Sequence, residues 1–248
     1  MTERASALSH ATAGAFDPTL NPLINLWGFG NEGHLKLLPS SEDVTEALAQ
    51  CGIEHLHFSP GPAIRKTISN LQLNLSAIAK GYAVDTLSEL FWEYGLTNTY
   101  VEIGGEIRVN GHNRDGRPWR IGIDLPADNA SPGKAIAGVF ALRNRAVATS
   151  GDYRNYFEDS NGHRRSHLID PRTGTLISYR LASVSVIATN CMIADGIATA
   201  LMVMGEEQGL PWVEDHDHVE ALFISRETDD TFRHVQSTGL PPLLHSPR

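Results

Sequence analysis

The spacing of apolar residues changes along the chain between a helical period and a strand period, which predicts an α+β fold. Helical spacing between turn signals predicts helices over residues 3–12, 41–51 (with Ser41 as its N-cap), 77–94, 190–204 and 206–215. Short runs rich in β-branched residues predict strands at 55–59, 64–68, 70–74, two within 99–111, 119–125, 135–142, 146–150, 153–158, 164–169, 181–188, 219–225 and 231–236. Residues 16–30 are turn-rich and predict irregular structure. Because strands outnumber helices and form hairpin-like runs, we expect a largely antiparallel sheet packed with helices in one domain over residues 1–248.

Composition, charge and the length of apolar runs argue against several classes of protein. The 248 residues are 41% hydrophobic and 20% charged, as in ordinary globular proteins. A net charge of −9 argues against nucleic acid as a partner, because phosphate binding needs a basic surface. No apolar run approaches the length of a membrane span, and the N-terminus predicts no signal peptide in this chain. Cys51 and Cys191 lie too far apart to form a metal-binding pattern.

The sequence "NCMIADGIATALMVMG" (190–205) predicts an apolar helix that carries two polar groups on one face. Asp195 and Thr199 are four residues apart, so their side chains point the same way. A buried carboxylate needs a partner, and two oxygen ligands at this spacing suit a hard cation such as Mg²⁺. A structural pair that is hydrogen-bonded to the backbone is an equal alternative at this point.

The sequence "NLSAIAKGYAVD" (74–85) begins a helix with small residues and a lysine. Small side chains allow close approach to a ligand, and Lys80 adds positive charge where the free N–H groups of a helix N-terminus favour an anion. Asp85 follows one turn after Gly81 and could accept from an amino or ribose group, or could face solvent. Many helices begin with small residues, so a purely structural start is as good an explanation.

Three further motifs could carry chemistry. In "EIGGE", Gly104 and Gly105 mark either a bulge between strands or a place where a ligand comes close. In "ATSGDYRNYFE", Thr149 and Ser150 suit phosphate oxygens or form a simple hydroxyl-rich turn. In "HLIDPRTG", His167 ends a strand and is either a structural hydrogen-bonding residue or a group that handles a proton near neutral pH.

Taken together and in this order, these motifs resemble the ApbE family, flavin transferases that move FMN from FAD onto a protein threonine or serine. The resemblance begins with "GAFDPTLNPLINLWGFG", continues through "NLSAIAKGYAVD", "VEIGGEIRVNG", "ATSGDYRNYF" and "HLIDPRTG", and ends with "SVSVIATNCMIADGIATALMVMG". It covers about residues 8–225 and implies an ApbE-like, T-fold-type architecture. Against the family pattern, residue 74 is Asn where Asp is common, and the N-terminal segment before the family's first long helix is lacking.

The resemblance implies Mg²⁺ as cofactor and FAD as substrate, with AMP as the leaving group. The implied roles are as follows: Asp195, Thr199 and the backbone carbonyl of Ala77 bind Mg²⁺; Lys80 and Asp85 lie along the FAD; Gly104, Gly105, Thr149 and Ser150 line the nucleotide cleft; and His167 is the catalytic base.

Two other functions remain open on the sequence. The same site could act as an FAD pyrophosphatase with water as nucleophile, or the chain could be a non-catalytic flavin-binding module. The resemblance further implies an acceptor protein with a modifiable Thr or Ser, such as a subunit of a membrane redox complex. It also implies a periplasmic, membrane-associated location, although no signal or anchor is expected in this chain.

Overall fold

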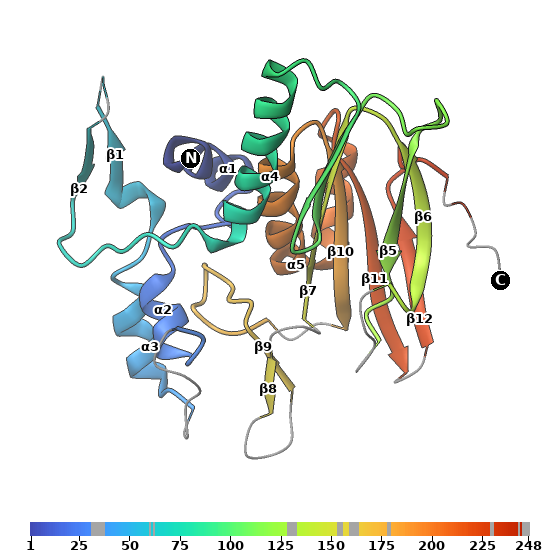
Figure 1. Ribbon diagram of the computed structural model, residues 1–248. Helices are drawn as coiled ribbons and strands as arrows, with labels where there is room; N and C mark the ends of the chain where they lie inside the picture. Colours follow the sequence, from blue (N-terminus) through green and yellow to red (C-terminus); the bar gives the residue numbers. More distant parts are fainter. Residues whose placement is uncertain are drawn as a thin grey trace. The chain divides into compact units, whose positions relative to one another are not determined.

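The structure is a computed structural model that describes residues 1–30, 38–59, 61, 63–127, 133–152, 156–158, 164–177, 180–228, 231–242 and 244 (Figure 1). The chain divides into two compact units. One unit comprises Met1–Ala77 and Arg154–Ser178, and the other comprises Ile78–Tyr153 and Tyr179–Arg248. The expectation of a single domain over residues 1–248 stays a prediction.

The first unit consists of short helices and two small hairpins. Its elements are α1 (Thr2–Ala11), α2 (Asn21–Leu26), α3 (Ser41–Leu48), a 3₁₀ turn (Ile53–His55), β1 (Leu56–Phe58), β2 (Ile64–Lys66), β8 (Tyr156–Glu158) and β9 (Arg164–Ser166). The N-cap of α3 is Ser40, not the predicted Ser41. The Ser40 hydroxyl accepts the N–H of Asp43, and the Asp43 carboxylate accepts the N–H of Ser40 in return, which makes a capping box.

Two predictions for this unit were wrong. Helix α2 forms within residues 16–30, which were predicted to be irregular. A proline in its first turn favours the start of the helix, and Leu23 is buried in a core with Val44 and Ala47 of α3. Residues 70–74 form no strand, only an isolated bridge between Leu20 and Gln72. Of the predicted strand 153–158, residues 153–155 lie outside the described residues.

The second unit is built on a six-stranded sheet with the order β12-β11-β10-β7-β4-β3. Its strands are β3 (Thr99–Ile103), β4 (Glu106–Asn110), β7 (Arg145–Gly151), β10 (Leu181–Ala188), β11 (Glu220–Thr228) and β12 (Thr231–Gln236). A separate hairpin joins β5 (Trp119–Asp124) to β6 (Ile136–Leu142). All pairs between named strands are antiparallel, as the sequence predicts.

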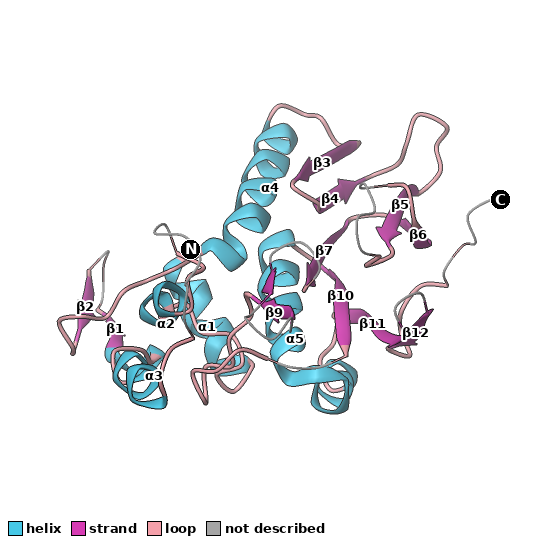
Figure 2. Cartoon of the chain, turned by 90° about the horizontal axis from the view of Figure 1, so that it is seen from below, coloured by secondary structure: helices cyan, strands magenta, loops and turns pink. Residues whose placement is uncertain are grey.

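Within this unit, helices α4 (Ser76–Glu93) and α5 (Cys191–Glu214) lie on one face of the sheet, and the β5–β6 hairpin lies on the other (Figures 1 and 2). The alternation of side chains along β4 shows how the two faces differ. Ile107 and Val109 enter the apolar core shared with the hairpin, whereas Arg108 and Asn110 bond to side chains of α4. The helix-facing side of the sheet therefore carries polar groups in contact with α4.

Helix α5 is buried over most of its first half and approaches α4 very closely. A Cβ on Gly81 of α4 would lie 2.5 Å from the carbonyl oxygen of Cys191, so only glycine fits there. Gly81 was interpreted as leaving room for a ligand; in the structure it leaves room for a second helix. A break at Gly205, with φ 70° and ψ 175°, divides α5 at the boundary between the two helices predicted over 190–204 and 206–215.

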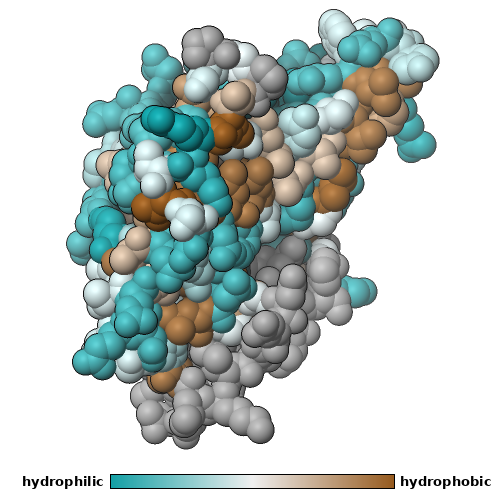
Figure 3. Space-filling model, turned by 90° about the vertical axis from the view of Figure 1, so that its left-hand side faces the viewer, coloured by the Kyte–Doolittle hydropathy of each residue, from teal (hydrophilic) through white to brown (hydrophobic). Residues whose placement is uncertain are grey.

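Apolar side chains also reach the surface. Trp92 and Tyr94 at the end of α4 are 61% and 77% exposed, and Leu96 follows them. Figure 3 shows apolar groups among hydrophilic side chains on the face that it draws. None of the described helices combines the length and apolar character needed to cross a bilayer.

Candidate active site

Asp195 lies in the second turn of α5 with only 4% of its surface exposed. Its Oδ2 accepts the backbone N–H of Gly81 in α4 at 3.0 Å. The pKa of Asp195 is raised to about 7, mainly by burial and also by the negative charge of Glu106, while the Gly81 N–H and Lys80 act in the opposite direction. A carboxylate in this environment gains from any cation that reaches it, as the Mg²⁺ prediction requires.

Glu106 is a second buried acid in the same place, and the sequence analysis did not single it out. It is 1% exposed at the start of β4. Its Oε1 lies 2.7 Å from the Nζ of Lys80, while its Oε2 has no hydrogen-bond partner among the described residues. The alternation with apolar Ile107 and Val109 could have indicated that Glu106 faces the opposite side of the sheet, but only the fold shows that helices cover that side.

The hydroxyl groups of the predicted site fall on two faces of the sheet. Ser150 Oγ lies 3.1 Å from Thr199 Oγ1, on the face covered by α5. Thr149 precedes Ser150 in β7, so its side chain points to the other face, where its Oγ1 lies 2.8 Å from Ser185 Oγ. The structure therefore brings Ser150 to Thr199, and Thr149 to the strand beside it.

Asp85 is fully engaged in joining α4 to α5. Its Oδ1 and Oδ2 accept the backbone N–H groups of Cys191 and Met192 at 2.9 Å each, and Oδ1 also accepts from Arg108 Nη1 at 2.7 Å. The carboxylate thus satisfies free donors at the N-terminus of α5 and balances a partly buried guanidinium. Its predicted role along the FAD stays a prediction.

Gly104 and Gly105 form the tight turn between β3 and β4. Both have positive φ, 61° and 100°, which explains the pair without a ligand. A Cβ on Gly104 would lie 3.2 Å from Cδ of Lys80 and 3.7 Å from Oε2 of Glu106. The turn therefore borders the Lys80–Glu106 ion pair.

The two remaining predicted residues belong to the first unit. His167 directly follows β9, with its ring edge-on to Phe29 at a centroid distance of 6.2 Å. Ala77 is the second residue of α4 and the last residue of the first unit's opening segment. Beside His167, the DPRTG turn is fixed by Asp170, which accepts from Arg172, and by the Trp27 indole N–H, which donates to the Gly174 carbonyl at 2.8 Å.

The donor set of the second unit fits a hard divalent cation. Asp195 and Thr199 supply a carboxylate and a hydroxyl one helical turn apart, and Oε2 of Glu106 has no hydrogen-bond partner among the described residues. No group of three or more His, Cys, Asp or Glu side chains suited to a metal is present in the described part of the chain. A site with so few carboxylates suits Mg²⁺, because Mg²⁺ usually keeps several of its waters and completes its coordination with substrate phosphates.

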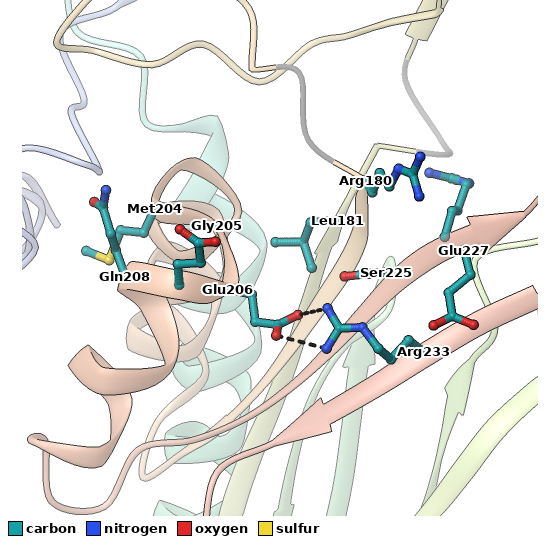
Figure 4. Close-up of a pocket in the computed structure, with 11 residues that line it drawn as sticks. Arg180, Leu181, Met204, Gly205, Glu206, Gln208, Ser225, Glu227 and Arg233 are labelled. Atoms are coloured by element: carbon teal, nitrogen blue, oxygen red, sulfur yellow. Dashed lines mark hydrogen bonds and ion pairs between the residues drawn. The ribbon is translucent and has the colours of Figure 1, made fainter.

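A pocket of about 460 Å³ lies elsewhere in the second unit, and none of the predicted site residues lines it (Figure 4). Arg233 crosses it to form a bidentate ion pair with Glu206, at 3.0 and 2.7 Å. Arg226 is held by both oxygens of Asp152. Since these charges already have partners, the buried acids on α5 and β4 are the stronger candidate for chemistry.

Comparison with known proteins matches this chain to one protein family and to individual relatives. The sequence pattern of the ApbE family matches residues 1–223. An FAD:protein FMN transferase of Vibrio cholerae is 44% identical over 98% of this chain and 71% of the relative, and one of Haemophilus influenzae is 39% identical over 98% and 69%.

Solved structures agree with the sequence relatives. The flavin transferase ApbE from Vibrio cholerae superposes with a TM-score of 0.84 at 42% identity, covering 98% of this chain and 75% of that one. The apo form of the flavinyl transferase ApbE from Pseudomonas stutzeri gives 0.83 at 41% identity, covering 95% and 71%. These similarities confirm the predicted fold class.

Proposed function

Because this chain belongs to the ApbE family, we propose that it transfers FMN from FAD to a threonine or serine hydroxyl of an acceptor protein, with release of AMP. The observation that carries the proposal is the buried Asp195 carboxylate on an otherwise apolar helix, beside Thr199, Ser150 and Lys80. Burial of a carboxylate is costly for stability, so the presence of Asp195 among oxygen and ammonium groups supports a binding role.

The reaction is a phosphoryl-type transfer. The acceptor oxygen forms a new bond to the FMN-side phosphorus, the bond from that phosphorus to the bridging oxygen breaks, and the bridging oxygen leaves with AMP. The acceptor hydroxyl must lose its proton, and His167 is the proposed proton acceptor because imidazole titrates near neutral pH. Lys80 supplies positive charge for the pyrophosphate, and the Ser150 hydroxyl can donate to its oxygens.

Mg²⁺ is the proposed cofactor, held by Asp195, Thr199 and the Ala77 carbonyl. When bound, it supplies charge neutralisation to the pyrophosphate of FAD. The protein as a whole carries a net charge of −9, so FAD binding must depend on the cation and on local donors and not on the general field.

The test is product identification by mass spectrometry. The protein is incubated with FAD, Mg²⁺ and a threonine-bearing acceptor, beside a matched acceptor with valine at that position. The proposal predicts that only the threonine acceptor gains the mass of an FMN group (FMN less one water), with AMP released in equal amount. Free FMN and AMP without acceptor modification would indicate an FAD pyrophosphatase, and FAD binding without turnover would indicate a flavin-binding module.

The acceptor and the location rest on the family resemblance. The proposed acceptor is a subunit of a membrane redox complex, and the proposed location is the periplasm at the membrane. Fractionation of cells that produce the full gene product, with detection of this chain in the periplasmic fraction, tests the location.

A further inference from the structure

The Glu106 side chain makes fewer hydrogen bonds than Asp85, another buried acid of its unit. Both carboxylate oxygens of Asp85 accept hydrogen bonds, from two backbone N–H groups and from Arg108. Glu106 is even less exposed, yet only its Oε1 has a partner, the Nζ of Lys80, and Oε2 has none among the described residues. A buried carboxylate oxygen without a donor is costly, so this arrangement suits a further ligand.

The charged groups around Glu106 indicate which kind of ligand would bind there. The start of α4 connects Glu106 and Asp195: the Lys80 ammonium lies 2.7 Å from Oε1 of Glu106, and the N–H of the next residue, Gly81, donates to Oδ2 of Asp195 at 3.0 Å. The ammonium of Lys80 balances one of these two acids, and the Lys80 side chain is 46% exposed. The site thus holds two acidic side chains and one basic one, which favours a cation over a neutral or anionic ligand.

We infer that Glu106 is a further carboxylate of the divalent-cation site, contributing its second oxygen, and that Lys80 competes with the cation for Glu106. This inference rests on the proposed function, because the cation in question is the one assigned to Asp195 and Thr199. It adds a residue from the sheet to a site that the sequence places only on helices.

A purely structural ion pair is the alternative, and Lys80 distinguishes the two. If Glu106 serves only to hold Lys80, Lys80→Met changes cation binding only through the charge removed near Asp195, and by the same factor when Glu106 is replaced by Gln. If Lys80 competes with the cation for Glu106, Lys80→Met should tighten cation binding by about tenfold in the protein that keeps Glu106, and by clearly less in Glu106→Gln. The two accounts thus predict different results for the double variant.

The experiment measures Mn²⁺ binding without FAD, by the electron paramagnetic resonance signal of the free ion. Glu106→Gln should weaken binding by about tenfold or more, and Glu106→Asp should recover part of the loss. The matched control is Glu102→Gln, which removes the same charge from an exposed position on the neighbouring strand and should change the dissociation constant by less than about twofold.

The outcomes separate this inference from the proposed function. Failure of the unsubstituted protein to bind Mn²⁺ would overturn the cation site itself, and the inference with it. Binding by the unsubstituted protein that Glu106→Gln does not weaken would overturn the inference alone. Melting curves without metal verify that each variant is folded. If Glu106→Gln does not fold, Glu106→Asp decides, because it keeps the charge and moves the carboxylate: weaker binding than in the unsubstituted protein supports the inference, and unchanged binding overturns it.

Discussion

The substitution Asp195→Asn should make the metal-free protein more stable at slightly alkaline pH. Asn keeps the shape of the side chain and an oxygen that can accept the Gly81 N–H, but it carries no charge. In the folded protein, burial raises the pKa of Asp195 to about 7 from an ordinary value of 3.8. The folded state therefore holds this proton more tightly than the unfolded state.

The sign and size of the effect follow from proton linkage. A raised folded-state pKa gives stability that is fully present below about pH 4 and is lost as the pH rises to about 7. The loss is about 1.4 kcal/mol per pH unit within that window, so about 2 kcal/mol disappears between pH 5.5 and pH 7 and little more above it. The asparagine variant lacks this contribution at every pH.

The assay is urea unfolding of both proteins in EDTA at several pH values between 5.5 and 8. The quantity of interest is the free energy of unfolding of the wild type minus that of the variant, because the contributions of titrating groups that do not interact with Asp195 cancel. We expect this difference to fall by about 2 kcal/mol across the range. A flat difference, or one that rises with pH, would refute the description of Asp195 as an uncompensated buried acid.

Three other substitutions test the surroundings of the site. Gly81→Ala should lower the free energy of unfolding by about 3 kcal/mol in urea titrations, because the new Cβ would overlap the backbone of Cys191; unchanged stability would contradict the close packing of α4 on α5. Asp85→Ala should cost about 3–5 kcal/mol by the same measurement, because it leaves Arg108 and two N–H groups unpaired, and a loss below 1 kcal/mol would be inconsistent with that role. His167→Ala should slow flavin transfer by about 10²–10⁴-fold while the dissociation constant for FAD changes little, and near-normal turnover would assign the base to another group.

Sequence patterns predicted the second unit better than the first. Its strands and helices are long and strongly patterned, such as the uniformly buried β10 and the apolar first half of α5, and their bounds were predicted to within one or two residues for most elements. In the first unit the elements are short, and tertiary contacts decide them. Helix α2 is only six residues long, and what stabilises it is Leu23 in the core and the Trp27 contact with Gly174.

Sequence patterns singled out individual residues of the candidate site but not the contacts between these residues. The spacing of Asp195 and Thr199 indicated a shared helix face, and the structure places them so. No local pattern could show that Gly81 and Asp85 act on the other helix, since those partners lie more than a hundred residues away in the sequence. Glu106 was missed for the same reason, because its burial depends on which face of the sheet the helices cover.

Binding of FAD by calorimetry, in Mg²⁺ and in EDTA, tests most directly whether the Asp195 site holds the substrate through a cation. The account predicts that the unsubstituted protein binds FAD at least tenfold more tightly in Mg²⁺ than in EDTA. It also predicts that Asp195→Ala, folded by its melting curve, binds FAD equally weakly in both. If that variant retained the full effect of Mg²⁺ on FAD binding, the cation would lie elsewhere, and the central claim about helix α5 would be wrong.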